Sequence, residues 1–189
     1  MVVIMPFEFE KLDIKDIILI KPKIFEDERG FFLETYKKDD FEKVGIKGEF
    51  VQDNHSKSKY GVIRGIHFQR EPYAQAKIVR CIKGTIYDIA VDLRKNSPTF
   101  GKWLGVILSD KNHYQLYIPR GFGHAFCVLS DDAEIVYKVD NTYAPDYDGG
   151  VIWNDDDIGI IWPIRNPIVS EKDSRLPTLK ELDKKGKLF

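Results

Sequence analysis

The chain has 189 residues, of which 43% are hydrophobic, and its 29 basic residues nearly balance its 30 acidic residues. This length supports one hydrophobic core and predicts a single domain over residues 1–189. A near-neutral charge without a basic block argues against a protein that binds nucleic-acid backbones. The start of the chain lacks the basic and long apolar regions of a secretory signal, and no run approaches the roughly 20 apolar residues of a membrane span. We therefore expect a cytoplasmic protein with no membrane contact.

Most of the chain consists of short β-branched or aromatic runs separated by Gly, Pro, Asn and Asp. Such runs predict antiparallel strands. In chain order, strands are expected at residues 17–20, 31–36, 77–83, 86–94, 103–108, 114–118, 124–129 and 135–139. One short helix is expected over residues 37–44, and another after a capping box at Thr178 and Glu181. The regular spacing of the strands favours a closed β architecture with a few short helices.

The clearest hairpin pattern lies at residues 77–94, where two expected strands flank Gly84. Alternation along the first strand places Lys77 on the same face as Val79 and Cys81. Two interpretations of this lysine stay open. It lies either at the rim of a sheet, where it reaches water, or inside a functional site.

Two histidines lie in segments with a recognisable form. His67 lies in Arg64-Gly65-Ile66-His67-Phe68-Gln69, and His124 follows a turn that begins at Pro119. This pair of segments is similar to the two motifs of a cupin barrel. Metal-binding cupins carry His-x-His in the first motif, whereas Gln69 stands at the second histidine here. Two imidazoles and an amide are a poor ligand set for zinc or iron, so we expect no metal and no other cofactor.

A wider set of segments follows in a fixed order along most of the chain. They are residues 27–34, 52–54, 64–69, 77–80, 119–126, 137–138 and 170–173. Together they resemble the dTDP-4-dehydrorhamnose 3,5-epimerase family. The resemblance implies an all-β, cupin-like jelly-roll barrel of antiparallel strands. It also implies an isomerase that inverts carbons 3 and 5 of dTDP-4-dehydro-6-deoxy-D-glucose, giving dTDP-4-dehydro-L-rhamnose for dTDP-L-rhamnose biosynthesis.

The resemblance further implies a catalytic role for five residues. His67 is expected to remove the proton beside the 4-keto group, with Asp173 orienting its ring. Tyr137 is expected to return a proton to the opposite face of the sugar. Lys77 and Arg64 are expected to stabilise the negative charge that develops on oxygen 4.

The other matching positions imply contacts with the nucleotide part of the substrate. They are Arg29, Phe32, Glu34, Gln52, Asn54, His124, Tyr143, Asp148 and Lys172. Among them, Phe32 and Tyr143 are plausible stacking partners for the thymine ring. Many members of the family have Glu where this chain has Asp148, and an ordinary turn residue is an equal interpretation of this aspartate.

Three alternatives to the double epimerase stay open. A mono-epimerase acting on carbon 3 or 5 of a related dTDP-4-keto sugar would keep the same histidine and lysine. A sugar-binding cupin without chemistry would lack the base or the acid, yet His67 and Tyr137 are both present. A metal-dependent cupin is disfavoured by Gln69. The family also forms homodimers, so a homodimer is expected here.

Overall fold

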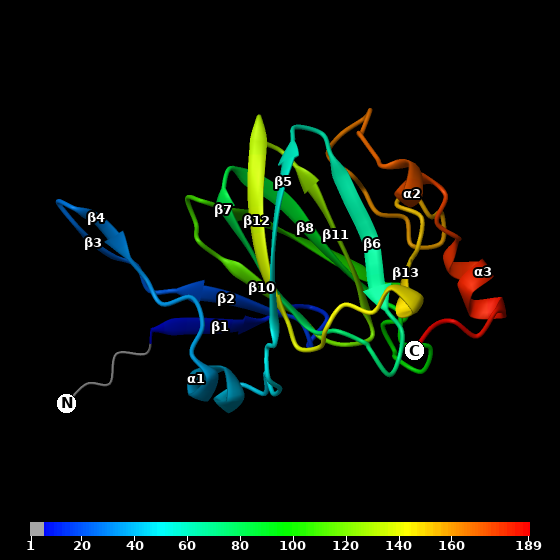
Figure 1. The fold of residues 1–189 in the computed structure, drawn as a ribbon, viewed down its shortest axis with the longest axis horizontal. Helices are drawn as coiled ribbons and strands as arrows, with labels where there is room; N and C mark the ends of the chain where they lie inside the picture. Colours follow the sequence, from blue (N-terminus) through cyan, green and yellow to red (C-terminus); the bar gives the residue numbers. More distant parts are fainter. Residues whose placement is uncertain (1–5) are drawn as a thin grey trace.

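The computed structural model describes residues 6–189 and contains two antiparallel sheets that face each other (Figure 1). Residues 1–5, at the start of the segment predicted not to be a secretory signal, lie outside the described residues. The six-stranded sheet has the order β1 (Phe7–Lys11), β2 (Ile18–Pro22), β10 (Gln115–Ile118), β7 (Lys77–Lys83), β12 (Asp132–Val139) and β5 (Gln52–Lys59). The five-stranded sheet has the order β13 (Asp148–Gly150), β6 (Ile63–Gln69), β11 (Phe122–Val128), β8 (Thr85–Asp92) and β9 (Trp103–Ser109). The predicted all-β, jelly-roll architecture is confirmed.

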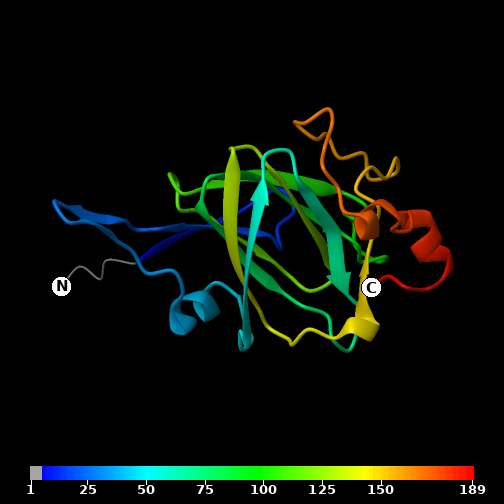
Figure 2. The same cartoon turned by 45° about the horizontal axis from the view of Figure 1, so that its top comes forward.

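The remaining elements lie outside these two sheets. The helices are α1 (Lys38–Lys43), the 3-10 turn η1 (Pro145–Tyr147), α2 (Glu171–Ser174) and α3 (Leu179–Lys184). Within residues 6–189, no helix has the length and apolar content needed to cross a membrane. Two short strands, β3 (Phe25–Asp27) and β4 (Gly30–Phe32), pair with each other as an arm. This arm projects from the barrel on the side opposite α2 and α3 (Figures 1 and 2).

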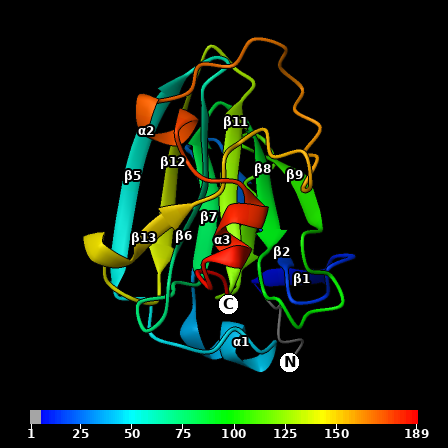
Figure 3. The same cartoon turned by 90° about the vertical axis from the view of Figure 1, so that its right-hand side faces the viewer.

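The main core fills the space between the two sheets. Val79 and Ile135 of the six-stranded sheet pack there against Ile86, Phe126 and other residues of the five-stranded sheet. The outer face of the five-stranded sheet is also covered, because the C-terminal segment and α3 lie against it (Figure 3). Strand β8 is therefore buried on both faces. Its Asp88 and Asp92 lie inside the protein and are completely buried.

The hairpin predicted at residues 77–94 is wrong, although both of its strands exist. Strand β7 pairs with β10 and β12, whereas β8 pairs with β11 and β9 in the other sheet. Gly84 joins them with a φ of +78°, and a Cβ there would lie 2.2 Å from the carbonyl oxygen of Asp132. The chain thus crosses between sheets at a corner that has no room for a side chain.

The strand predicted at residues 31–36 is also wrong in its extent, because β4 ends at Phe32. Beyond it, the backbone carbonyl of Thr35 accepts a hydrogen bond from the side chain of Gln115 (2.9 Å). The segment is thus held by a side chain of β10 and not by the backbone of a neighbouring strand.

Candidate active site

A cleft of about 320 Å³ lies where β5, β6, β7, β12 and β13 approach one another beside α2. Its lining residues are Gln52, Asn54, His67, Phe68, Gln69, Gln75, Lys77, Tyr137, Tyr143, Asp148 and Lys172. Most of these positions were predicted from the sequence as catalytic or substrate-binding. The fold brings them together from segments far apart in the chain.

His67 is held by a buried carboxylate. Its Nε2 lies 2.7 Å from Oδ1 of Asp173, whose Oδ2 accepts a hydrogen bond from the backbone N–H of Gly65 (3.2 Å). Burial would raise the pKa of Asp173, but the hydrogen bond from His67 and that from Gly65 keep this pKa below its ordinary value. Because an ionised carboxylate only accepts hydrogen bonds, Nε2 carries the proton and Nδ1 is left as the basic nitrogen.

Asp173 owes its position to the short helix α2. The Ser170 side chain caps this helix and accepts a hydrogen bond from the backbone N–H of Asp173 (3.0 Å). The contact between α2 and β6 then places the carboxylate behind the histidine. The short capped helix thus brings Asp173 to His67, although the two residues are 106 positions apart in the chain.

Gly65 sets the direction of the strand that carries His67. Its φ is +121°, and β6 shifts its register against β11 between His124 and Phe126, as expected for a bulge. A Cβ at this position would lie 2.5 Å from the Cβ of Ala125 and 2.6 Å from the carbonyl oxygen of His124.

We expect Gly65→Ala to lower the free energy of unfolding by about 3 kcal/mol, through strain at positive φ and overpacking. Urea denaturation would measure this loss. The same substitution at Gly186, which has a positive φ but open space around it, is the control and should cost less. An equal loss in the two variants would contradict the steric argument.

Lys77 and Tyr137 lie on the other side of the cleft from β6. Lys77 is buried, and its Nζ lies 5.9 Å from the centre of the Tyr137 ring. Burial lowers the pKa of Lys77 to about 8, against the attraction of Asp88 and Asp148. Burial raises the pKa of Tyr137, so its phenol keeps its proton at neutral pH. The site interpretation of Lys77 is therefore the one that its place in the fold supports.

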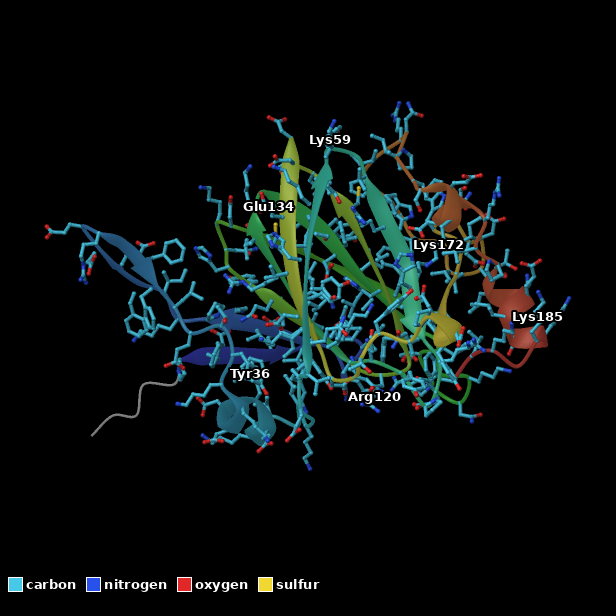
Figure 4. The ribbon with its side chains drawn as sticks, in the orientation of Figure 1. Tyr36, Lys59, Arg120, Glu134, Lys172 and Lys185 are labelled. Atoms are coloured by element: carbon cyan, nitrogen blue, oxygen red, sulfur yellow. The ribbon has the colours of Figure 1, made fainter. Side chains whose placement is uncertain are left out.

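The mouth of the cleft is polar. Nζ of Lys172 forms an ion pair with Oδ2 of Asp148 (2.6 Å), and Figure 4 shows Lys172 on the side where α2 approaches β6. The side chain of Gln52 donates to Asn54 (2.9 Å) and accepts from the backbone N–H of Tyr143 (3.1 Å). The Tyr143 ring is exposed at this mouth and open to a ligand. The turn interpretation of Asp148 is incomplete, because this residue begins β13 and holds Lys172.

Gln69 stands where a metal-binding cupin carries its second histidine. Its Nε2 donates to the carbonyl oxygens of Tyr73 (2.7 Å) and Thr142 (3.1 Å), and its Oε1 accepts from the N–H of Ala144 (2.8 Å). The amide therefore links the loop that contains Tyr73 to the loop over residues 142–144. In the part of the chain that the structure describes, no group of three His, Cys, Asp or Glu side chains is placed to hold a metal ion.

Comparison with known proteins places this chain in a family. The family model described as dTDP-4-dehydrorhamnose 3,5-epimerase matches residues 11–181. The chain belongs to the dTDP-4-dehydrorhamnose 3,5-epimerase family. The family predicted from the sequence is thus confirmed, and with it the class of enzyme, an isomerase.

Individual members of this epimerase family are similar over nearly their whole length. The dTDP-4-dehydrorhamnose 3,5-epimerase of Shigella flexneri is 57% identical over 164 residues, which cover 86% of this chain and 91% of that protein. The Legionella pneumophila epimerase, solved with dTDP-4-keto-L-rhamnose, is 40% identical with a TM-score of 0.92 and covers 96% and 97% of the two chains. A 3'-monoepimerase from Streptomyces bikiniensis, solved with dTDP-quinovose, is 36% identical with a TM-score of 0.88 and covers 94% and 90%.

Some predicted epimerase residues lie outside the cleft. The exposed Arg64 donates to the Ser58 hydroxyl (2.9 Å), and His124 is buried with its Nε2 2.8 Å from Oδ1 of Asp88. Arg29 and Phe32 lie on the β3–β4 arm, where the Arg29 guanidinium pairs with Asp27 of the same arm.

Glu34 follows that arm and is also absent from the cleft lining. Sequence reasoning missed Gln75, whose amide donates to the carbonyl oxygen of Asn141 (2.8 Å), and it missed Asp88. Neither lies in a pattern that marks a site, since Gln75 is in a loop and Asp88 alternates with apolar residues.

Proposed function

We propose that this chain epimerises carbons 3 and 5 of dTDP-4-dehydro-6-deoxy-D-glucose to give dTDP-4-dehydro-L-rhamnose. One observation carries the proposal: the His67–Asp173 pair and the buried Lys77 share a single cleft. A base and a cation so placed suit removal of a proton next to a ketone. The ligands named for the Legionella pneumophila and Streptomyces bikiniensis structures support a dTDP-linked sugar as the substrate.

The reaction needs a base on one face of the sugar. A proton beside the 4-keto group is acidic only if the enolate that forms is stabilised. Nδ1 of His67 takes this proton, and the negative Asp173 stabilises the imidazolium that results. The Lys77 ammonium donates a hydrogen bond to oxygen 4 as its negative charge develops. The Arg64 guanidinium lies outside the cleft lining, but it is close enough to Tyr137 to oppose the rise in the pKa of its phenol, so it adds positive charge near the proton donor.

Inversion then needs a proton from the opposite face. Tyr137 is the donor that we assign, because it lines the cleft on β12 and burial keeps its phenol protonated. Proton return by Tyr137 regenerates the ketone with the opposite configuration. Each inversion leaves His67 as an imidazolium and Tyr137 as a tyrosinate. The imidazolium then gives its proton to water and the tyrosinate takes one from water, so both groups are restored before the next inversion.

The proposed chemistry uses a lysine where other cupins use a metal ion. Both side-chain polar atoms of Gln69 already form hydrogen bonds to backbone groups of neighbouring loops, so this amide does not act as a metal ligand in the proposed reaction. Lys77 supplies the positive charge at oxygen 4 that a metal ion supplies elsewhere. We therefore propose that proton transfer proceeds without metal or redox cofactor.

Proton exchange separates double from single epimerisation. Incubating the purified protein with dTDP-4-dehydro-6-deoxy-D-glucose in deuterated water should introduce deuterium at carbons 3 and 5, as followed by NMR. The structural similarity to a 3'-monoepimerase makes single epimerisation the second candidate. Exchange at one carbon only would establish that candidate, and exchange at neither would contradict both.

The arm residues point to a homodimer. Arg29, Phe32 and Glu34 are absent from the cleft of their own chain, and the β3–β4 arm lies on the far side of the barrel from α2. Phe31 and Phe32 are 58% and 66% exposed on this arm, which is much apolar surface for a projecting hairpin. We propose that the arm packs on a second copy and that its three predicted binding residues complete the partner's cleft.

The outer face of the six-stranded sheet supports this pairing. A second cleft of about 310 Å³ lies there, lined by residues of β5, β7, β10 and β12. Nε of Arg80 in this cleft is buried and has no hydrogen-bond partner among the described residues. A second copy seated on this face would cover the cleft and could satisfy the guanidinium.

Mixing two defective variants tests this arrangement. Arg29→Ala damages only the arm, and His67→Ala damages only the cleft. If the arm acts on the partner, a mixed dimer holds one intact site, and random pairing restores about a quarter of wild-type sites. Activity assays on the coexpressed pair, with sedimentation to confirm dimers, would measure the recovery.

The control for this mixture is Asp173→Asn with His67→Ala, because both changes damage the cleft. Such a pair leaves no intact site and should recover nothing. Equal behaviour of the two mixtures, or a monomer in sedimentation, would contradict the shared site.

A further inference from the structure

A second histidine–carboxylate pair lies inside the barrel beside the cleft, with the His124 ring centre 6.5 Å from that of the cleft residue Tyr137. Nε2 of His124 lies 2.8 Å from Oδ1 of Asp88, and both residues are buried. His124 on β11 is directly opposite His67 on β6 in the sheet register. The two histidines thus lie side by side, and each directs Nε2 at its own carboxylate.

Asp88 has an oxygen without a partner. Its Oδ2 is buried and makes no hydrogen bond with any residue in the range 6–189. A buried carboxylate oxygen in this state is costly and needs a physical explanation. Its neighbours on the inward face of β8, Ile86 and Ala90, belong to the apolar core and offer it nothing.

The compensating charge inside the same barrel is Lys77. Lys77 is the one lysine among the buried residues that the structure describes. It makes no hydrogen bond to any described charged residue and feels Asp88 and Asp148 only at a distance. Strand β7 faces β8 across the core, with Val79 of one strand packed in the same cluster as Ala90 of the other. A buried cation and a buried anion therefore share the barrel interior without touching.

This separation has a chemical consequence. A direct ion pair would occupy the ammonium N–H groups that must reach the substrate oxygen. A carboxylate farther away stabilises the charge of Lys77 through the low-dielectric interior and leaves those N–H groups free.

We propose that Asp88 is a positioning residue for the epimerisation, which keeps Lys77 charged from a distance and fixes the proton of His124 on Nε2. The inference rests on the proposed role of Lys77 in the reaction. Burial lowers the pKa of His124, so its ring stays neutral and Nδ1 remains an acceptor on the side away from Asp88. The predicted contact of His124 with the substrate would then use Nδ1.

Other titratable groups face the same space and bear on the charge of Lys77. They are His67, Tyr137, His124, Asp148, Lys172 and Asp173. Of these, Asp148 also attracts the Lys77 ammonium, but its carboxylate is paired with Lys172. Asp88, in contrast, has no cationic partner nearer than Lys77 among the described residues, because its hydrogen-bond partner His124 is neutral.

The test is the pH dependence of kcat in Asp88→Asn. The reaction needs protonated Lys77, so activity falls as pH rises through the titration of this lysine. Removing a nearby negative charge makes the ammonium easier to deprotonate, and the alkaline limb should move to lower pH by about one unit. Asp88→Glu, which keeps the charge, should leave the limb near its wild-type position even if kcat falls.

Asp92→Asn is the matched control. Asp92 is equally buried on the same strand, but its carboxylate is bound by Arg94, Ser97 and Thr99 at the far end. This variant should be less stable, with an unmoved alkaline limb. An unmoved limb in folded Asp88→Asn would overturn the proposal.

Two further outcomes keep the test decisive. If Asp88→Asn does not fold, His124→Phe removes the hydrogen bond to Asp88 and leaves the charge of Asp88 in place. In this variant kcat should fall while the alkaline limb stays, and movement of the limb to lower pH would overturn the role assigned to the charge. A wild-type protein that exchanges no substrate protons at any pH would instead contradict the proposed function itself.

Discussion

Replacing His67 with alanine is expected to lower kcat by about 10⁴-fold, the upper end of the range for a general base. This magnitude follows from the geometry, because His67 is the cleft-lining side chain whose ring is oriented by an ionised carboxylate. Without it, water would have to remove the proton beside the ketone. Proton exchange from substrate in deuterated water, measured by NMR, would show the loss at both carbons.

The matched variant for this prediction is Asp173→Asn. It keeps the shape of the side chain but removes the charge that stabilises the imidazolium, so kcat should also fall, by less than in His67→Ala. An unchanged thermal denaturation curve for His67→Ala would show that the lower kcat reflects lost catalysis and not lost folding. Full exchange activity in His67→Ala would contradict the assignment of the base and direct attention to Tyr137.

The strands that the sequence predicts well are those with apolar alternation. Strand β12, predicted at residues 135–139, spans Asp132–Val139, and β9 matches its prediction within one residue. Strand β5 has the sequence QDNHSKSK, without a single apolar side chain, and was not predicted as a strand. It forms because it pairs with β12 along its whole length at the edge of the sheet, and this partner is distant in sequence.

Pairing between strands was the weaker part of the prediction. Gly84 looks like a hairpin turn because a positive φ suits both a hairpin and a crossing between sheets. The difference lies in the neighbours of β7 and β8, which come from β10, β12, β11 and β9. No local pattern encodes those partners, so the hairpin interpretation was wrong although the strand limits were nearly right.

The residues of the candidate site also fall into two groups, those that the sequence predicted and those that it did not. His67, Lys77 and Tyr137 were found because their segments match a family, and the fold places all three in one cleft. Asp88 was missed because a charged residue within an alternating strand normally faces water. Here both faces of β8 are buried, and the polar face points into the barrel.

Removing the charge of Lys77 is expected to have the second largest effect. Lys77→Met keeps the length and apolar stem of the side chain but lacks the donor for oxygen 4. Loss of one such donor typically raises the barrier by about 2.7–4 kcal/mol, or about 10²–10³-fold in kcat. Because the enolate is stabilised less, proton exchange and inversion should fall together, with little change in KM.

The pH dependence tests whether Lys77 acts through its charge. Burial lowers its pKa to about 8, so the ammonium is present below that pH and is lost above it. Wild-type activity should therefore decline as pH rises through about 8. Lys77→Arg keeps a positive charge at every working pH, so a weaker activity without this decline is expected. If the decline persisted in Lys77→Arg, the titrating group would be a different one, and the assignment of Lys77 as the charge at oxygen 4 would lose its support.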